Sequence, residues 1–500
     1  MNYDSDFNYN ELLSPDLLLE RELALFLDME ERYISIEELS NKFDVSIKRI
    51  RRVVKLLQDD ILEYDHQGFV FSICKSKGIL LKVPINDDLK HFIAFIIQKN
   101  PLIKMLKEIC LNEFVSVRDY ANRFYFSEAT VRRNIKKIKK FLSQFDIGLT
   151  RETIVLQGEE QQIRFFMLLF FWRLNSGISW PFTHVDEVEV EHIVHQFSEL
   201  DRAYNKEVTR LEKRRRMYYI AIVKIRTRKK NYIQQNEEWN KASKNNKFFN
   251  EFRTVFYRLN NVLYAPPEEI AFHYEVWKSC SWVPDMQQVF AIETLNGSIA
   301  AKASTLFFDR FADHFFEMNL SEKKIAEEFI FCVHTLCFNF KKFNSDINGY
   351  YYQKQIQKYY PKLQSRLEVF IDELYAQSGY SLFLERDFLI THYSMLFSNL
   401  KKTNEYEKTI RVAIETDLPN ILWELLCTQV HETFSRKYKL DINNSGEIKN
   451  EEDVDVILTT VPLRGPGRAY QEEKVVAINS ELQRADIRKI EYVFDYFLQN

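Results

Sequence analysis

The sequence predicts a mainly α, multidomain protein that ends in a small α/β module. Glycine and proline each occur only 11 times in 500 residues, and a chain so poor in helix breakers is expected to be mostly helical. A 28-residue pattern is found twice near the N-terminus, and strands alternate with helices in the last hundred residues. The length exceeds what one hydrophobic core usually organises, so we expect several domains.

The repeated pattern accounts for the first elements. Residues 34–61 read ISIEELSNKFDVSIKRIRRVVKLLQDDI, and residues 115–142 read VSVRDYANRFYFSEATVRRNIKKIKKFL; the two align without a gap at a shift of 81 positions. In each copy we expect a short amphipathic helix, a break, and a longer helix that begins after a capping serine, Ser46 or Ser127. This arrangement is typical of a helix-turn-helix, in which the second helix enters the major groove of DNA.

The repeat extends past these helices. Gly68 and Gly78 bracket FVFSICKSK in the first copy, and Gly148 and Gly158 bracket LTRETIVLQ in the second. Each bracket predicts a short β-hairpin after the second helix. We therefore expect two N-terminal winged helix-turn-helix modules, and two such modules on one chain suit a long or bipartite site on double-stranded DNA.

The nucleic-acid signal is local, because the net charge of the whole chain is only −3. Residues 115–142 hold eight Lys or Arg against two acids, whereas residues 34–61 hold six against five. The alternative is a helix hairpin that only faces solvent, and two copies in one register argue against it. Arg49, Arg52, Thr130 and Arg133 are our candidates for base contacts. The full set expected to contact DNA is Lys48, Arg49, Arg52, Lys55, Thr130, Arg133, Lys136, Lys137 and Lys140.

From residue 158 to about 404 the sequence is helical and rich in aromatic residues. Weak breaks at 265–269 and 282–286 suggest two helical bundles. Residues 206–230 contain eleven basic and two acidic residues, which we interpret as a solvated basic helix face, with contact to DNA or to a phosphorylated group as the alternative. His334 and His392 each lie on an apolar helix, and periodicity alone predicts two semi-buried core histidines.

The last hundred residues change pattern. Strands are expected at 409–416, at KLDI, at 453–461 and at KVVAINS, with helices from about 419 to 437 and from 481. This alternation indicates a small parallel sheet. The loop after the first strand has neither a Gly-rich phosphate cradle nor a cysteine that could act as a nucleophile. The sequence also lacks HExxH and any Cys/His cluster with metal spacing, so we expect no enzyme, no metal and no cofactor.

Six scattered cysteines form no CxxC pair and no disulfide framework, which favours reduced thiols in a cytoplasmic protein. The N-terminal segment lacks the apolar core of a signal peptide. The longest apolar run, FFMLLFFW at 165–172, is far too short to span a membrane. We therefore expect a cytoplasmic location without a membrane partner.

The order of these features resembles the Mga/AtxA family of virulence transcription regulators from Gram-positive bacteria. The resemblance rests on the doubled helix-turn-helix, on GEEQQIRFFM at 158–167, and on the C-terminal α/β module. It implies a first winged helix-turn-helix at 1–86, a second, Mga-type helix-turn-helix at 87–158, two helical-bundle phosphotransferase-system (PTS) regulatory domains, or PRDs, at 159–283 and 284–403, and an EIIB-like α/β domain at 404–500.

The resemblance also implies particular histidines. Regulatory domains of this family can be phosphorylated on histidine by the phosphocarrier HPr. CVHTLCF and ITHYSML look like the two histidine positions of the second regulatory domain, which makes His334 and His392 candidates. In the first domain the first position has no histidine, and His273 in EEIAFHYEVW looks like the second position or its neighbour. The EIIB-like module lacks the phosphorylatable cysteine of transport components, and in the family it helps to form dimers.

Our hypothesis is a cytoplasmic DNA-binding activator that forms a homodimer through its C-terminal domain and is tuned by PTS histidine phosphorylation. A PRD-type RNA-binding antiterminator is one alternative, although such proteins begin with a β-rich domain and this chain begins with helices. A non-catalytic PTS-linked interaction scaffold is another. A phosphotransfer enzyme is opposed by the missing cysteine.

Overall fold

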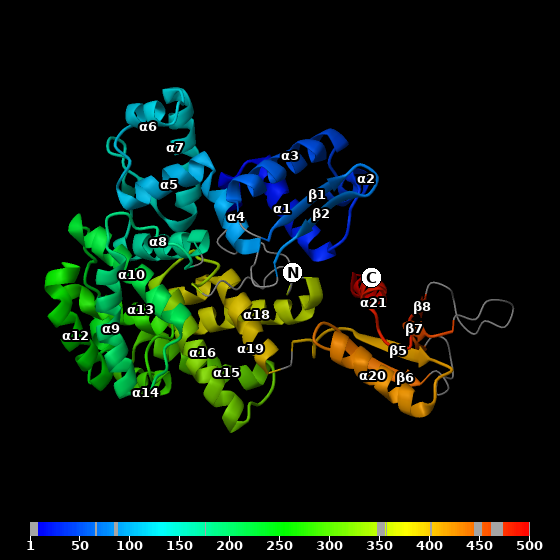
Figure 1. Cartoon of the computed structure of the whole chain (residues 1–500). Coiled ribbons are helices and arrows are strands. Elements are labelled where there is room, and N and C mark those ends of the chain that lie inside the picture. Colours follow the sequence, from blue (N-terminus) through cyan, green and yellow to red (C-terminus); the bar gives the residue numbers. More distant parts are fainter. Residues whose placement is uncertain are drawn as a thin grey trace. The chain divides into compact units, whose positions relative to one another are not determined.

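The structure is a computed structural model that describes residues 9–65, 68–84, 89–175, 177–347, 356, 358–400, 403–444, 453–461 and 474–499. The chain divides into two compact units, residues 1–299 with 335–350 and residues 300–334 with 351–500. The described residues are mostly helical, and one small parallel sheet lies near the C-terminus (Figure 1). The predicted mainly α fold with a C-terminal parallel sheet is confirmed.

The first unit begins with a helix-turn-helix followed by a hairpin. Leu39, Ile50 and Leu57 are fully buried, as the apolar stripes of the two helices require. Gly78 in the hairpin has φ +107°, and a Cβ there would lie 2.1 Å from the carbonyl oxygen of Ile34, so only glycine fits. The elements are η1 (Tyr9–Leu12), α1 (Pro15–Glu30), α2 (Ile36–Phe43), α3 (Ile47–Tyr64), β1 (Val70–Cys74) and β2 (Gly78–Lys82), with β1 and β2 antiparallel.

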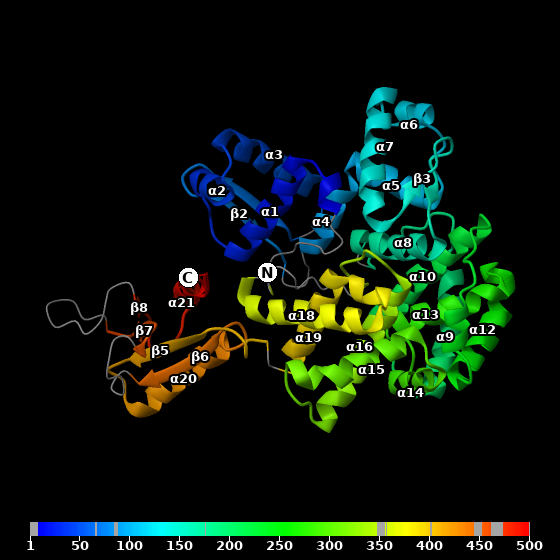
Figure 2. The ribbon, with the colours of Figure 1, turned by 180° about the vertical axis from the view of Figure 1, so that it is seen from behind.

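The second helix-turn-helix follows directly. Its α6 and α7 lie side by side in both views (Figures 1 and 2), and Tyr120, Val131 and Ile138 are fully buried. The hairpin after α7 is short, with two residues in each strand. The elements are α4 (Leu89–Gln98), α5 (Pro101–Leu111), α6 (Val117–Arg123), α7 (Glu128–Leu142), η2 (Ser143–Phe145), β3 (Gly148–Leu149) and β4 (Leu156–Gln157).

The rest of the first unit is a bundle around α8, the helix that contains the apolar run at 165–172. Nearly every residue of α8 is buried, and the ring of Phe165 stacks on that of Phe340 with centroids 4.0 Å apart. A helix that is apolar on all sides belongs in a core, and α8 occupies one here. The elements are α8 (Glu160–Asn175), α9 (Glu187–Ala203), α10 (Arg210–Arg228), α11 (Glu237–Ala242), α12 (Lys247–Leu263), η3 (Pro267–Glu269), α13 (Ile270–Ser279) and α14 (Met286–Asn296).

The second unit opens with another helical segment. Phe307, Phe370 and Tyr393 form its aromatic core, with ring centroids 4.9 to 6.5 Å apart. The division between the units falls within α16, directly after His334. The elements are α15 (Ile299–His314), α16 (Leu320–Asn339), α18 (Pro361–Ser378), η4 (Ser381–Leu384) and α19 (Arg386–Asn399).

The C-terminal module is a four-stranded parallel sheet in the order β6-β5-β7-β8. Alternate residues of β5, from Ile410 to Ile414, pack with Val430 and Phe434 of α20 and with Phe494 of α21. This period of two is the one expected for a strand with one face against helices. The elements are β5 (Thr409–Glu415), α20 (Asn420–Phe434), β6 (Lys439–Asn444), β7 (Val456–Thr459), β8 (Val475–Ala477) and α21 (Arg484–Gln499).

Candidate DNA interface and buried histidines

The second recognition helix, α7, presents a basic row to solvent. Its cap is the predicted one: Ser127 Oγ accepts a hydrogen bond from the Thr130 N–H at 3.1 Å. Thr130 itself is half-buried, and its Oγ1 lies 2.9 Å from Ser127 Oγ. The other candidates on this helix are all exposed on the side away from the core, and they are Arg133, Lys136, Lys137 and Lys140. α7 therefore offers a row of positive charge that a phosphate backbone can approach.

The first recognition helix, α3, has the same local design. Ser46 caps it, with its Oγ accepting from the Arg49 N–H at 3.4 Å. Lys48, Arg52 and Lys55 are exposed, whereas Arg49 is half-buried. Arg49 thus lies at the side of the helix rather than on its outermost face.

An acidic residue from α1 neutralises part of this face. Asp16 Oδ2 lies 2.5 Å from Arg52 Nη2, and Asp16 Oδ1 lies 3.2 Å from Arg49 Nε. Arg49 Nη2 also donates to the carbonyl oxygen of Pro15 at 2.9 Å. Burial acts to raise the pKa of Asp16, but the hydrogen bonds from both arginines outweigh it and lower that pKa. Sequence reasoning missed Asp16, because it precedes the repeat and nothing local connects it to α3.

His334 lies at the centre of the second unit's helical core. Its ring is fully buried, its Nδ1 is 2.9 Å from Ser304 Oγ, and its Nε2 is 2.6 Å from the hydroxyl of Tyr393. Burial lowers its pKa to about 3, so the ring is neutral at physiological pH. The prediction of a semi-buried histidine is wrong here, since the ring is fully buried between its own helix, Ser304 of α15 and Tyr393 of α19.

His392, the second candidate for phosphorylation, directly precedes Tyr393 on α19. The same helix therefore carries the hydroxyl that contacts His334. The side chain of His392 is also buried rather than semi-buried. The ring stacks on Phe388 with centroids 3.8 Å apart, and Nδ1 lies 2.8 Å from the Phe388 carbonyl oxygen. A carbonyl oxygen only accepts, so Nδ1 must be the donor.

His273, on α13 of the first unit, is buried beside a carboxylate. Its Nδ1 is 2.6 Å from the Tyr219 hydroxyl, and its Nε2 is 3.4 Å from Glu269 Oε2. Glu269 also accepts two hydrogen bonds from Arg164, at 2.8 and 3.0 Å. Burial acts to raise the pKa of Glu269, but the neighbouring His273 and the hydrogen bonds from Arg164 lower it to about 2. His273 therefore belongs to a buried ionic network.

Three cations of the basic stretch at 206–230 lie in the same interior, so our interpretation of it as a solvated helix face is wrong for these three, whereas Arg228, Lys229 and Lys230 are exposed. Arg216, Lys224 and Arg226 of α10 are all buried and form ion pairs with Asp201, Glu189 and Glu160 respectively. Buried charges are tolerated when they are paired and hydrogen-bonded. The partners come from α8 and α9, which explains why charge counting along α10 alone could not find them.

The comparisons with known proteins address the second helix-turn-helix directly. Residues 86–171, which contain α5, α6 and α7, match the Mga helix-turn-helix domain. The match supports the resemblance of this chain to the Mga/AtxA family.

Three relatives from Bacillus anthracis are similar to parts of this chain. It is 23% identical over 178 residues to the anthrax toxin expression trans-acting positive regulator, which covers 36% of each chain. It is 19% identical over 227 residues to the capsule synthesis positive regulator AcpB, covering 45% of this chain and 46% of the relative. For the capsule synthesis positive regulator AcpA the figures are 21% over 228 residues and 45% of each. Each match spans less than half of the relative. The names of all three describe positive regulators.

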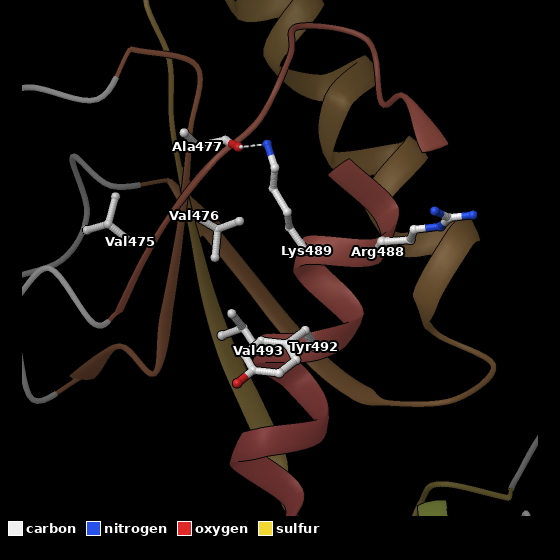
Figure 3. A pocket seen from close by; sticks show the side chains of 7 residues that line it. All are labelled: Val475, Val476, Ala477, Arg488, Lys489, Tyr492 and Val493. Carbon is white, nitrogen blue, oxygen red and sulfur yellow. Dashed lines mark hydrogen bonds between the residues drawn. The ribbon is translucent and has the colours of Figure 1, made fainter. Parts of the chain in front are cut away.

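The described part of the C-terminal module has a surface depression of about 540 Å³ between β8 and α21 (Figure 3). Its lining consists of Val475, Val476, Ala477, Arg488, Lys489, Tyr492 and Val493, and Lys489 Nζ donates to the Ala477 carbonyl oxygen at 3.4 Å. These seven residues include no carboxylate, histidine or cysteine.

Burial raises the pKa of the Cys427 thiol to about 11, so this half-buried side chain on α20 stays protonated near neutral pH.

Within the described ranges of the chain, no helix is both long enough and apolar enough to cross a membrane.

Proposed function

We propose that this chain is a cytoplasmic DNA-binding transcription regulator that acts as an activator. The observation that carries the proposal is the exposed basic row of α7, because it lies within the segment that matches the Mga helix-turn-helix domain. The printed names of the relatives, positive regulators of toxin expression and of capsule synthesis, support an activator of virulence- or metabolism-linked genes.

We assign most of the DNA affinity to the second helix-turn-helix. Residues 115–142 carry eight basic and two acidic residues, and the first copy has five acids among its 28 residues and a further one, Asp16, on its arginines. Lys136, Lys137 and Lys140 are assigned to phosphates, and so are Lys48 and Lys55. Arg133 and Thr130 on α7, with Arg49 and Arg52 on α3, are assigned to base edges in the major groove.

The test is binding of the full chain to double-stranded fragments of the source genome, followed by fluorescence anisotropy at several salt concentrations. Alanine at Arg133, Lys136 and Lys140 together should weaken binding and flatten the log–log salt dependence by about 1.8, since each of the two lysines assigned to phosphates contributes about 0.9. A matched variant with alanine at Lys244, Lys247 and Arg258, three exposed cations of the helical bundle, should bind normally.

Wild-type protein that bound no fragment would exclude DNA binding and would favour the scaffold. An unchanged salt slope in the α7 variant would instead move the DNA-binding surface to another part of the chain.

The domain division from the resemblance forms part of the proposal: helix-turn-helix modules at 1–86 and 87–158, PRDs at 159–283 and 284–403, and an EIIB-like domain at 404–500. We further propose that HPr phosphorylates His334 or His392. Phosphorylation adds about two negative charges, and both side chains are buried among aromatic rings. Such a charge must open the local packing or recruit a cation, which couples the modification to a conformational change. His273 is the weakest candidate, because the Glu269 carboxylate beside it would repel a phosphoryl group.

The proposed homodimer forms through the C-terminal module. Ile421, Leu422 and Leu425 are exposed together on the first turns of α20, while Leu426 and Val430 of the same helix face the core. A cluster of exposed aliphatic side chains on one helix is a surface that association would cover.

A further inference from the structure

The turns of the two helix-turn-helix modules share a backbone hydrogen bond and a left-handed residue at corresponding positions. In the first, the Val45 N–H donates to the Ser40 carbonyl oxygen at 3.2 Å; in the second, the Phe126 N–H donates to the Ala121 carbonyl oxygen at 2.9 Å. Donor and acceptor are shifted by 81 positions in both cases, as the sequence repeat requires. The residue before each donor has a left-handed backbone, with φ 50° at Asp44 and φ 55° at Tyr125.

The residue with the left-handed backbone is an aspartate in the first turn and a tyrosine in the second. Aspartate is among the residues that adopt the left-handed conformation readily, whereas a bulky side chain there is an outlier. The cost is not offset by packing, because the side chain of Tyr125 is 96% exposed. Neither the turn nor the core therefore explains a tyrosine at this position.

The position of Tyr125 suggests what the ring touches. It stands two residues before Ser127, the N-cap of α7. When a recognition helix enters the major groove, the helix before it crosses the sugar–phosphate backbone, so the turn between them lies at the edge of the groove. Tyrosine hydroxyls are among the groups that donate to phosphate oxygens in protein–DNA complexes.

We propose that Tyr125 contacts the sugar–phosphate backbone of double-stranded DNA beside α7, with its hydroxyl donating to a phosphate oxygen and its ring lying against the deoxyribose. This inference rests on the proposed DNA-binding function. The contact positions the helix without reading sequence, and it is made by an uncharged group.

These properties define the test on the full chain, with one genomic fragment selected by binding and one random fragment. Tyr125→Gly should lower affinity for both fragments by about tenfold, the value of a hydrogen bond to a charged group. The slope of the salt dependence should stay unchanged, because no cation is lost. The midpoint of thermal unfolding should stay the same or rise, because glycine relieves the left-handed backbone. Tyr125→Phe, which keeps the ring, should show the part of the loss that belongs to the hydroxyl.

Tyr264 supplies the matched control. It is also a tyrosine with a left-handed backbone, φ 54°, and its side chain is 56% exposed, but it caps α12 in the helical bundle. Tyr264→Gly should leave affinity for both fragments unchanged. Wild-type affinity in Tyr125→Gly, or an equal loss in Tyr264→Gly, would overturn the proposal. Wild-type protein that bound neither fragment would instead overturn the DNA-binding function itself. Wild-type affinity in Tyr125→Phe alone would overturn the hydroxyl contact and leave the ring contact supported.

Discussion

Asp16 Oδ2 of α1 lies 2.5 Å from Arg52 Nη2 of α3, so the carboxylate forms an ion pair with a cation of the first recognition helix. The same carboxylate reaches Arg49, and both arginines are assigned to DNA. A DNA phosphate or base edge that engages either arginine must therefore compete with Asp16. We therefore expect Asp16 to weaken DNA binding by the first helix-turn-helix. The basic row on α7, by contrast, is exposed to solvent.

Replacing Asp16 with asparagine should therefore strengthen binding to DNA. The variant frees two cations, so the log–log salt dependence should steepen by up to about 1.8. Affinity for random fragments should rise along with affinity for selected ones, because the gain is electrostatic. Fluorescence anisotropy over a salt series measures both, and Asp309→Asn, which removes an exposed acid on α15, is the control. Weaker binding in Asp16→Asn would show that Asp16 orients the arginines for base reading rather than competing with DNA.

The burial of His334 predicts how stability depends on pH. The pKa of His334 is about 3 in the folded state, below the usual value of 6.5. Between pH 6.5 and pH 3 the unfolded chain therefore binds a proton at His334 that the native chain does not bind. Stability should fall as the pH drops from about 6.5 towards 3, with a slope of at most about 1.4 kcal/mol per pH unit from this residue. Hydrogen exchange of the α16 amides at several pH values measures it. His334→Gln should flatten the dependence, whereas His184→Gln, which removes an exposed histidine, should not. Identical pH profiles for wild type and His334→Gln would contradict the assignment.

Phosphorylation of His334 by HPr should be limited by access. The Tyr393 hydroxyl occupies Nε2, so Tyr393→Phe should raise the rate at which His334 is labelled when the protein is incubated with phosphoenolpyruvate, Enzyme I and HPr. The readout is acid-labile, base-stable label located by mass spectrometry. Tyr218→Phe removes a different buried hydroxyl, one that donates to the Ser179 carbonyl oxygen, and should have no effect. If wild type takes up no label, or if the His334/His392 double alanine variant is fully labelled, these histidines are core residues and control comes from elsewhere.

The exposed cluster on α20 should decide the oligomeric state. Aspartate at Ile421 and Leu425 would bury unpaired carboxylates in the proposed interface, which costs several kcal/mol. The dissociation constant of the dimer should then rise by at least about a hundredfold, as measured by analytical ultracentrifugation. Val369→Asp, on the exposed side of α18, should leave the dimer intact. A dimer that survives both aspartates has its interface on another surface.

Local signals were readable from the sequence because they connect residues within a few positions. Ser46 and Ser127 were predicted as N-caps and are N-caps, since capping depends on a serine and the three residues after it. The parallel sheet was predicted because alternating strand and helix patterns restrict the ways a chain can bury its apolar faces. The 81-position shift also relates the two turns, since the hydrogen bonds Val45–Ser40 and Phe126–Ala121 fall at corresponding positions.

Only the tertiary structure decided which charges meet and which rings are buried. Arg52 pairs with Asp16, a residue 36 positions earlier in the sequence. The buried cations of α10 pair with acids of α8 and α9. The sequence of a single helix contains neither kind of partner. The depth of His334 was underestimated for the same reason, since its surroundings come from α15 and α19 as well as from its own helix. Periodicity reports which face of a helix is apolar; burial and ion pairing depend on what other elements place against that face.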